Sequence, residues 1–91
     1  MSKSVWKSEI FTGPGMDQIA LPEGAVFLSV QTQGSSMVSI WAEIDYSRPS
    51  KQYTILTVGT GAQLVPDEKK YIGTYQIERL QEVYHVFELL N

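Results

Sequence analysis

The sequence predicts an all-β domain, a small antiparallel sandwich or partly open barrel of about seven strands with at most one short helix. Apolar and polar residues alternate over most of the chain, as they do in strands with one buried face. The alternating runs are rich in β-branched and aromatic residues, and Gly, Pro and Ser interrupt them at intervals of roughly 8–12 residues. These observations indicate a sheet protein built from short strands.

The expected strands follow one another with a turn signal between neighbours. Residues 4–12 form the first strand and residues 17–21 the second, separated by Gly13-Pro14-Gly15. Glycine allows a positive φ there and proline removes a backbone donor, so the ladder ends. Further strands are expected at residues 25–33, 36–45, 51–58, 71–77 and 82–89.

Alternation also predicts which side chains of two strands face the core. The apolar face of residues 36–45 consists of Val38, Ile40, Ala42 and Ile44. Trp41 lies on the opposite face of that strand. The apolar face of residues 25–33 is expected to be Val26, Leu28 and Val30. Gly34-Ser35 between the two strands fits a type II′ hairpin turn, whose first central position favours glycine.

Residues 74–90 are the one stretch where a helix competes with strands. The straight-chain residues at 76–82 have good helix propensity. Residues 83–89, however, alternate and are mostly β-branched or aromatic. The alternation predicts two strands here, and a helix stays the alternative.

Size and composition define the class of protein. The 91 residues suit one domain spanning 1–91. The absence of cysteine excludes thiolate catalysis and cysteine zinc sites, and it fits a reducing cytoplasm because small secreted domains generally rely on disulfides. No apolar run approaches the ~18 residues of a membrane span, and the N-terminal segment lacks the apolar stretch of a signal peptide. We therefore expect a cytoplasmic protein without a membrane partner.

The net charge of −3 argues against nucleic acid as a partner. Nucleic-acid binding depends largely on basic residues that neutralise phosphates. A small anionic ligand needs only a local group of cations, so it stays possible.

Six short segments carry a resemblance to a known group of proteins. They are Trp6-Lys7-x-Glu9, Gly24-Ala25-x-x-Leu28-x-Val30-Gln31-x-Gln33, Ile40-Trp41-Ala42, Val58-Gly59-Thr60-Gly61, Tyr71-Ile72-Gly73-Thr74-Tyr75 and His85-Val86-Phe87-Glu88-Leu89. As a set, over nearly the whole chain, they resemble a family of short β-rich proteins from bacteriophages and prophages. The resemblance implies a viral source and a β fold. By analogy with small accessory phage proteins, it implies evasion of host defence, for instance by sequestering a cyclic-nucleotide or ADP-ribose-type signal.

The loop Gly59-Thr60-Gly61 is one candidate for binding an anion. It leaves a strand, and glycines let backbone N–H groups converge on a negative charge. Neither the phosphate-loop motif nor the dinucleotide motif is present. A plain turn at the end of a strand is therefore the alternative.

The basic stretch at residues 48–51 is a second candidate. Arg48 can hold a phosphate with two hydrogen bonds, Lys51 adds a point charge, and the flanking Tyr46 and Tyr53 have rings that can stack on a base. A solvated loop is the alternative. Lys69-Lys70 repeats the pattern next to acidic residues that offset its charge.

The sequence contains no set of residues that indicates catalysis. His85, the only histidine, shares the alternation of Val83 and Phe87, which predicts a hydrogen-bonded residue in the interior or at an interface. The carboxylates are scattered over strand positions, so no acid–base pair or metal site can be named. We therefore expect a protein that is not an enzyme and needs no cofactor or metal.

Trp41, on the second face of its strand, indicates a ligand platform or a subunit contact, since exposed apolar patches mark interaction sites. With the apolar residues 83–90, it predicts a homo-oligomer. The function expected from the sequence is sequestration of a small anionic, nucleotide-like signal by a phage-type protein. The ligand-binding residues would be Arg48, Lys51, Tyr53, Gly59, Thr60, Gly61 and Trp41. The alternative is a structural or protein-interaction module that binds a host or viral protein through an aromatic face.

Overall fold

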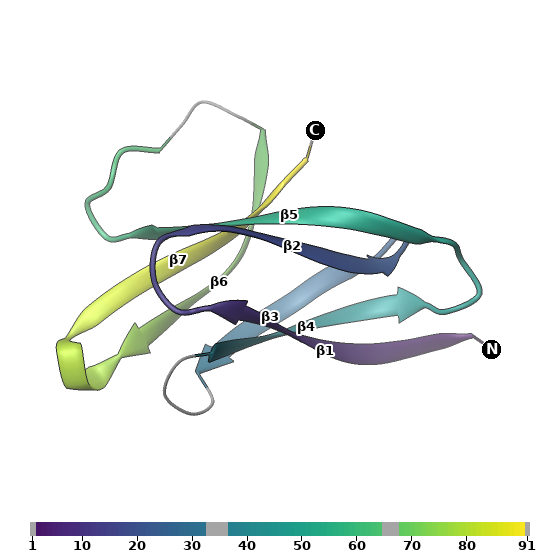
Figure 1. Cartoon of the computed structure of the whole chain (residues 1–91), viewed down its shortest axis with the longest axis horizontal. Coiled ribbons are helices and arrows are strands. Elements are labelled where there is room, and N and C mark those ends of the chain that lie inside the picture. The colour runs from purple at the N-terminus through teal and green to yellow at the C-terminus, as the bar shows by residue number, and fades with distance from the viewer. Residues whose placement is uncertain (1, 33–36, 65–67, 91) are drawn as a thin grey trace.

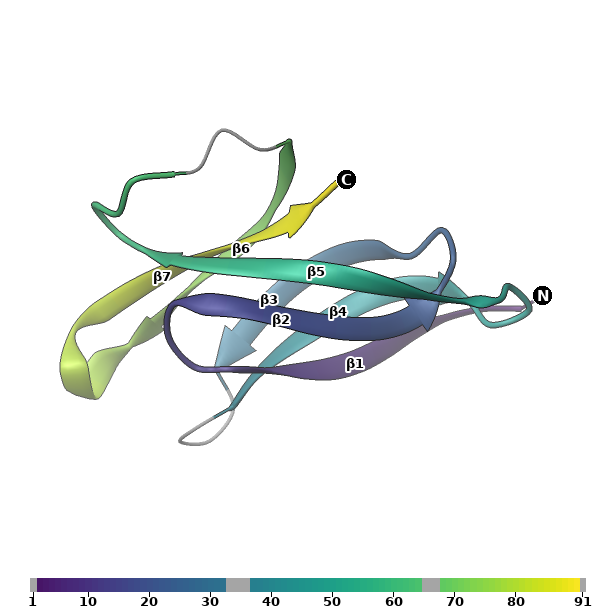
Figure 2. The same ribbon diagram turned by 45° about the horizontal axis from the view of Figure 1, so that its top comes forward.

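The computed structural model describes residues 2–32, 37–64 and 68–90, which form seven strands in two antiparallel sheets (Figure 1). The strands are β1 (Lys3–Phe11), β2 (Gly15–Pro22), β3 (Val26–Thr32), β4 (Met37–Asp45), β5 (Ser50–Gly59), β6 (Lys69–Ile77) and β7 (Glu82–Leu89). One sheet has the order β1-β4-β3 and the other the order β2-β5-β7-β6. Figure 2 shows them as two layers, so the predicted all-β fold is confirmed, in its sandwich form.

Helical structure in the described residues is limited to one 3-10 turn, η1 (Glu78–Leu80), between β6 and β7. Gln81 ends this turn in the left-handed conformation, with φ 53°, and its N–H donates to the Glu78 carbonyl at 3.1 Å. The strands expected within residues 74–90 are therefore confirmed, and the helical alternative is wrong. In the same described part of the chain, no helix has the length and apolar character that a membrane span requires.

The core lies between the two sheets, and β4 forms its centre. Side chains at the four positions predicted from alternation, Val38, Ile40, Ala42 and Ile44, are at most 1% exposed. The four-stranded sheet contributes Ile19, Leu21, Ile55 and Val86 from the facing side. One strand face predicted from the sequence is thus confirmed in full.

A β-bulge in β3 overturns the face predicted for that strand. Its register against β4 shifts between Phe27 and Ser29, so the alternation changes phase. Val30 stays in the core and Phe27 packs against it, whereas Val26 and Leu28 are exposed. The predicted face of Val26, Leu28 and Val30 is therefore wrong, because one inserted residue reverses the side-chain directions. The type II′ turn predicted at Gly34-Ser35 lies outside the described residues.

The two sheets contact each other where β6 packs on β3. A Cβ atom placed on Gly73 would lie 3.0 Å from Cγ2 of Val30 and 3.5 Å from its backbone nitrogen. The absence of a side chain at Gly73 is what permits this close approach. The register of β6 on β7 also shifts beside this point, between Tyr71 and Gly73.

Two buried tyrosines tie the turns of the chain to the core. The Tyr53 hydroxyl accepts a hydrogen bond from the Ala25 N–H at 3.0 Å and donates to the Pro22 carbonyl at 3.1 Å. The Tyr75 hydroxyl accepts from the Gly13 N–H at 2.9 Å. Burial of Tyr75 raises the pKa of its hydroxyl. The turns before β2 and before β3 are therefore each held by a side chain of the four-stranded sheet.

Candidate functional site

The outer face of the four-stranded sheet carries a row of large side chains. The strand register places Met16 of β2 beside Leu56 of β5, Leu56 beside Phe87 of β7, and Phe87 beside Tyr71 of β6. Paired residues of antiparallel strands project to the same face, so these four side chains cross the whole sheet. The rings of Tyr71 and Phe87 meet edge to face, with centroids 5.7 Å apart. We call these four residues the outer row.

Leu56 distinguishes the outer row from scattered surface residues. Its side chain is only 8% exposed, yet it is not part of the cluster that forms the core between the sheets. The strand register sets it between Met16 and Phe87, while Met16 and Tyr71 at the two ends of the row are 63% and 56% exposed. The outer row is thus a second apolar layer with open ends, which is typical of an interaction surface.

A chain of hydrogen bonds runs beside the outer row. Nε2 of His85 lies 2.7 Å from the Thr60 hydroxyl, and Nδ1 lies 3.1 Å from the Thr74 hydroxyl. The Thr74 hydroxyl is in turn 2.5 Å from the Tyr71 hydroxyl. A neutral imidazole carrying its proton on Nε2 fits a single direction along the chain, from Tyr71 to Thr74 to Nδ1, and from Nε2–H to Thr60. Thr60 then donates to the Val83 carbonyl at 3.4 Å.

These contacts hold the imidazole at both nitrogens and fix its orientation. A histidine beside a hydroxyl is also part of a hydrolase triad, in which a carboxylate at the second nitrogen stabilises the charged ring. In this chain a hydroxyl, that of Thr74, occupies the second nitrogen. The imidazole is therefore fixed between the hydroxyls of Thr60 and Thr74.

The position of His85 corrects one alternative from the sequence. Val86 of β7 lies in the core and Tyr84 packs against it, which places His85 on the outer face. The expected hydrogen bonding is present, whereas the interior placement is wrong. Both faces of β7 carry apolar residues, so the alternation could not decide which face points into the core.

A pocket of about 440 Å³ adjoins the hydrogen-bonded chain. Its lining residues are Gly59, Thr60, Gln81, Glu82, Val83 and Tyr84. The Tyr84 hydroxyl donates to the Glu82 carboxylate at 2.6 Å, and this hydrogen bond is the main cause that raises the pKa of Tyr84. Glu82 is the one charged residue among the six that line the pocket. The pocket therefore suits a cationic or neutral group better than an anion.

The predicted anion loop, Gly59-Thr60-Gly61, forms the turn after β5. The Thr60 N–H donates to the Val83 carbonyl and the Ala62 N–H to the Gly59 carbonyl, both at 3.1 Å. The Thr60 amide of the loop and the Ala62 amide that follows it thus have partners within the chain. This hydrogen bonding is that of an ordinary turn at the end of a strand, which was the alternative to an anion-binding loop.

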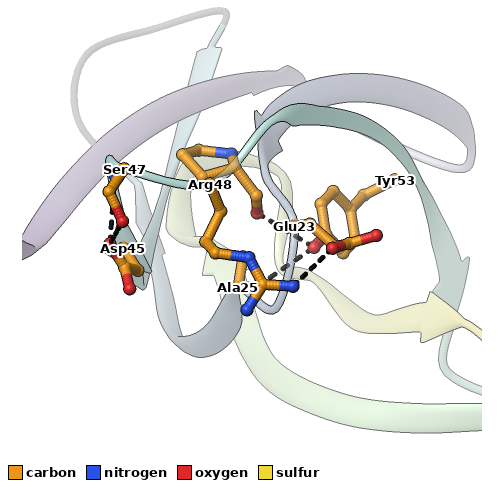
Figure 3. Close-up of polar contacts among 7 residues, drawn as sticks. Glu23, Ala25, Asp45, Ser47, Arg48 and Tyr53 are labelled. Atoms are coloured by element: carbon orange, nitrogen blue, oxygen red, sulfur yellow. Dashed lines mark hydrogen bonds and ion pairs between the residues drawn. The ribbon is translucent and has the colours of Figure 1, made fainter.

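Arg48 forms an ion pair inside the chain, as Figure 3 shows. Its Nη2 lies 2.5 Å from Oε1 of Glu23, and both side chains are about half exposed. Nearby, hydrogen bonds to Asp45, chiefly from the Ser47 hydroxyl, lower the pKa of that carboxyl to about 2. Glu23 reaches Arg48 from a distant part of the sequence and offsets its charge, which the residues next to Arg48 in the sequence do not indicate.

Tyr53 and Lys51 lie together at the start of β5. Nζ of Lys51 is 5.3 Å from the centre of the Tyr53 ring. That ring is 6% exposed and contacts Phe27 edge to face, with centroids 5.6 Å apart. Tyr53 is thus a core residue, and stacking of its ring on a base, expected from the sequence, does not fit its position.

Lys51 shares its surroundings with Lys70, from the other basic stretch of the sequence. Partial burial raises the pKa of Glu88 on β7, and both cations act against this rise. The register pairs Glu88 with Lys70 of β6 and with Ile55 of β5. The fold therefore brings one lysine from each basic stretch to the same carboxylate.

The ligand-binding residues predicted from the sequence occupy three separate places. β5 has ten residues, about 30 Å at the usual rise per residue. Arg48 and Lys51 lie at its start and Gly59-Thr60-Gly61 follows its end, at opposite ends of the molecule (Figure 1). Trp41 lies on the outer face of the other sheet, as predicted, between Lys7 and Ser29. Within the described residues there is also no cluster of metal-ligating side chains.

The residues that sequence reasoning missed are Met16, Leu56, Phe87 and Thr74. Each alternates in its own strand without a distinguishing motif. Only the pairing of β2, β5, β7 and β6 places them on one face. The sequence contains one indication of this site: His85 and Phe87 are two residues apart and so lie on the same face of their strand.

No curated protein and no solved structure matches the chain. A family model described as a domain of unknown function (DUF7352) matches residues 1–91. The match covers the whole sequence, and the chain therefore belongs to this family of domains.

Proposed function

We propose that the protein is a non-catalytic interaction module that binds another protein through the outer face of its four-stranded sheet. The observation that carries the proposal is the burial of Leu56, which lies within the outer row and outside the core cluster between the sheets. A sheet whose second face is solvated normally carries polar residues there. An apolar layer with open ends indicates a surface that a partner completes.

The shape of the face favours a protein over a small ligand. The outer row crosses four strands, which lie about 4.8 Å apart, so it is roughly 14 Å wide. Small-molecule sites are concave and enclose most of the ligand. The outer row instead has exposed ends, and the hydroxyls and imidazole of Thr60, His85 and Thr74 lie beside it. An apolar centre with a polar rim is the usual anatomy of a protein interface.

The partner we propose presents an apolar patch to the outer row. Glu82 and Tyr84 share the face of Val86 rather than that of Phe87, so the pocket beside them is not part of this contact surface.

Met16→Lys is expected to abolish capture of this partner, because it places a charge at the open end of the outer row. Leu28→Lys is the matched control, since Leu28 is a similarly exposed aliphatic side chain on β3 of the other sheet. Both variants should keep the melting temperature of the parent, as exposed substitutions generally change stability by less than about 0.5 kcal/mol. The measurement is quantitative mass spectrometry of proteins captured from the source cells by each immobilised variant.

Proteins that bind through the outer row are those captured by the parent and by Leu28→Lys but not by Met16→Lys. Addition of excess soluble parent protein should also displace these proteins. Equal capture by both variants, or loss with Leu28→Lys alone, would exclude the outer row as the binding surface.

We also propose a phage or prophage source and a partner in the host cytoplasm. The supports are the six segments that resemble phage and prophage proteins and the absence of cysteine. In that setting the bound protein belongs to the host or to the virus, and the binding serves infection.

A second candidate function is sequestration of a small anionic, nucleotide-like signal. The observation in its favour is that Lys51 and Lys70, from separate basic stretches, both act on Glu88. In this candidate function the anion binds at the lysine pair rather than at Arg48 or the glycine loop. Thermal shift against cyclic di- and trinucleotides and ADP-ribose derivatives should then show stabilisation by about 2.7 kcal/mol at 100 times the dissociation constant. Lys70→Ala should reduce the shift, and a panel without any shift would remove this candidate.

A further inference from the structure

β1 is an edge strand with one open side. It pairs with β4 over its full length, without a bulge, and has no strand on its other side in the sheet order β1-β4-β3. The Tyr46 N–H donates to the Ser2 carbonyl, so even-numbered residues direct their backbone groups toward β4. The Phe11 N–H donates to the Asp17 carboxylate on the opposite side. The backbone groups of Val5, Lys7 and Glu9 therefore point to the open side.

This open edge carries exposed apolar side chains. Val5 is 56% and Phe11 71% exposed, and Trp6 is exposed as well. Natural edge strands are usually protected by proline, a bulge or unpaired charges, above all lysine. β1 has neither proline nor bulge, and its Lys3 is already paired with Glu43 at 3.7 Å. Only Lys7 is left to protect this edge against pairing with another strand, and Glu9 on the same face of β1 offsets its charge.

We propose that two copies of the chain pair antiparallel through β1, about a two-fold axis at Ser8. This register sets Lys7 of each copy opposite Glu9 of the other, and Val5 opposite Phe11. Lys7 and Glu9 exchange backbone hydrogen bonds across the axis. The Phe11 N–H stays with Asp17, and the Phe11 carbonyl accepts from the facing Val5. Opposite charges and paired apolar side chains directly across antiparallel strands stabilise the pairing.

Charge also excludes the neighbouring registers. An axis at Lys7 would set lysine against lysine, and an axis at Glu9 would set glutamate against glutamate. Like charges directly opposite each other destabilise strand pairing. Within the described residues Lys7 and Glu9 have no ion-pair partner, so the dimer is what matches these charges.

The proposed dimer joins the two three-stranded sheets into one continuous sheet. The outer row lies on the other sheet of each copy, so both outer rows stay free. This goes beyond the proposed function by making the module bivalent, and it raises the avidity for a partner that presents two epitopes.

The test is a charge exchange measured by sedimentation equilibrium at low ionic strength. Lys7→Glu and Glu9→Lys each replace two attractive contacts across the axis with two repulsive ones, and each should weaken the dimer about tenfold or more. The double variant Lys7→Glu/Glu9→Lys restores opposite pairs and should return the dissociation constant close to the parent value. Arg79→Glu makes the same charge change as Lys7→Glu in the exposed η1 turn and should leave it unaltered.

Circular dichroism melting establishes that each variant is folded, as expected for exposed side chains. A monomeric parent protein, single variants that associate as the parent does, or a double variant as weak as the single ones would each overturn the proposal. Dimerisation lost with Met16→Lys and kept with Lys7→Glu would move the self-contact to the outer row. The partner capture described above does not use β1, so either proposal can fail alone.

Discussion

Replacing Tyr53 with phenylalanine is expected to lower the free energy of unfolding by about 1–3 kcal/mol. The Tyr53 hydroxyl accepts from the Ala25 N–H and donates to the Pro22 carbonyl, and the side chain is 6% exposed. Removing the hydroxyl leaves a backbone donor and a backbone acceptor without this partner in a site that water does not readily reach. The edge-to-face contact with Phe27 survives, so the loss reports the hydrogen bonds rather than the ring.

The measurement is chemical denaturation at equilibrium, with Tyr71→Phe as the control. Tyr71 has an exposed hydroxyl that bonds to Thr74, so its loss should change stability by less than about 0.5 kcal/mol. Equal losses for the two variants would contradict the view that Tyr53 fastens the turn between β2 and β3 to the core.

Gly73→Val is expected to destabilise the protein by a similar amount, about 1–3 kcal/mol, for the opposite reason. A Cβ at position 73 would already lie 3.0 Å from Cγ2 of Val30, and valine adds two further methyl groups. The contact that must open is the one between β6 and β3, in other words between the two sheets. Overpacking rather than lost contact would cause the effect.

Val30→Ala provides the test of that cause. Alone it should destabilise by removing buried methyl groups, whereas combined with Gly73→Val it should recover part of the loss. The coupling energy from a double-mutant cycle measures this recovery. Strictly additive effects would show that Gly73 and Val30 do not determine the spacing of the sheets.

The strands could be predicted from the sequence because they depend on local pattern. Alternation defined the limits of β4 closely and its buried face correctly, since each core position there is two residues from the next. The same reasoning failed in β3, where a bulge at Phe27 changes the phase. A bulge leaves no fixed signature in a single sequence, so the exposed Leu28 could not be distinguished from a core residue.

The candidate site could be predicted less well because it depends on which strands are neighbours. Thr60 and His85 are 25 residues apart and meet only because β5 pairs with β7. Glu23 pairs with Arg48 from 25 residues away in the sequence. Local charge alone therefore overestimated how free Arg48 is to bind an anion. Local composition indicates which residues can bind, whereas the sheet order decides which of them act together.

Binding of another protein by the outer row can be measured in the cell by site-specific photo-crosslinking. A photoreactive phenylalanine analogue is placed at Tyr71 in one protein and at Leu28 in another, and both are irradiated in the source cells. We expect a crosslinked second protein from position 71 that is missing from position 28. Crosslinks from position 28 alone, or from position 71 only to another copy of the same chain, would contradict it.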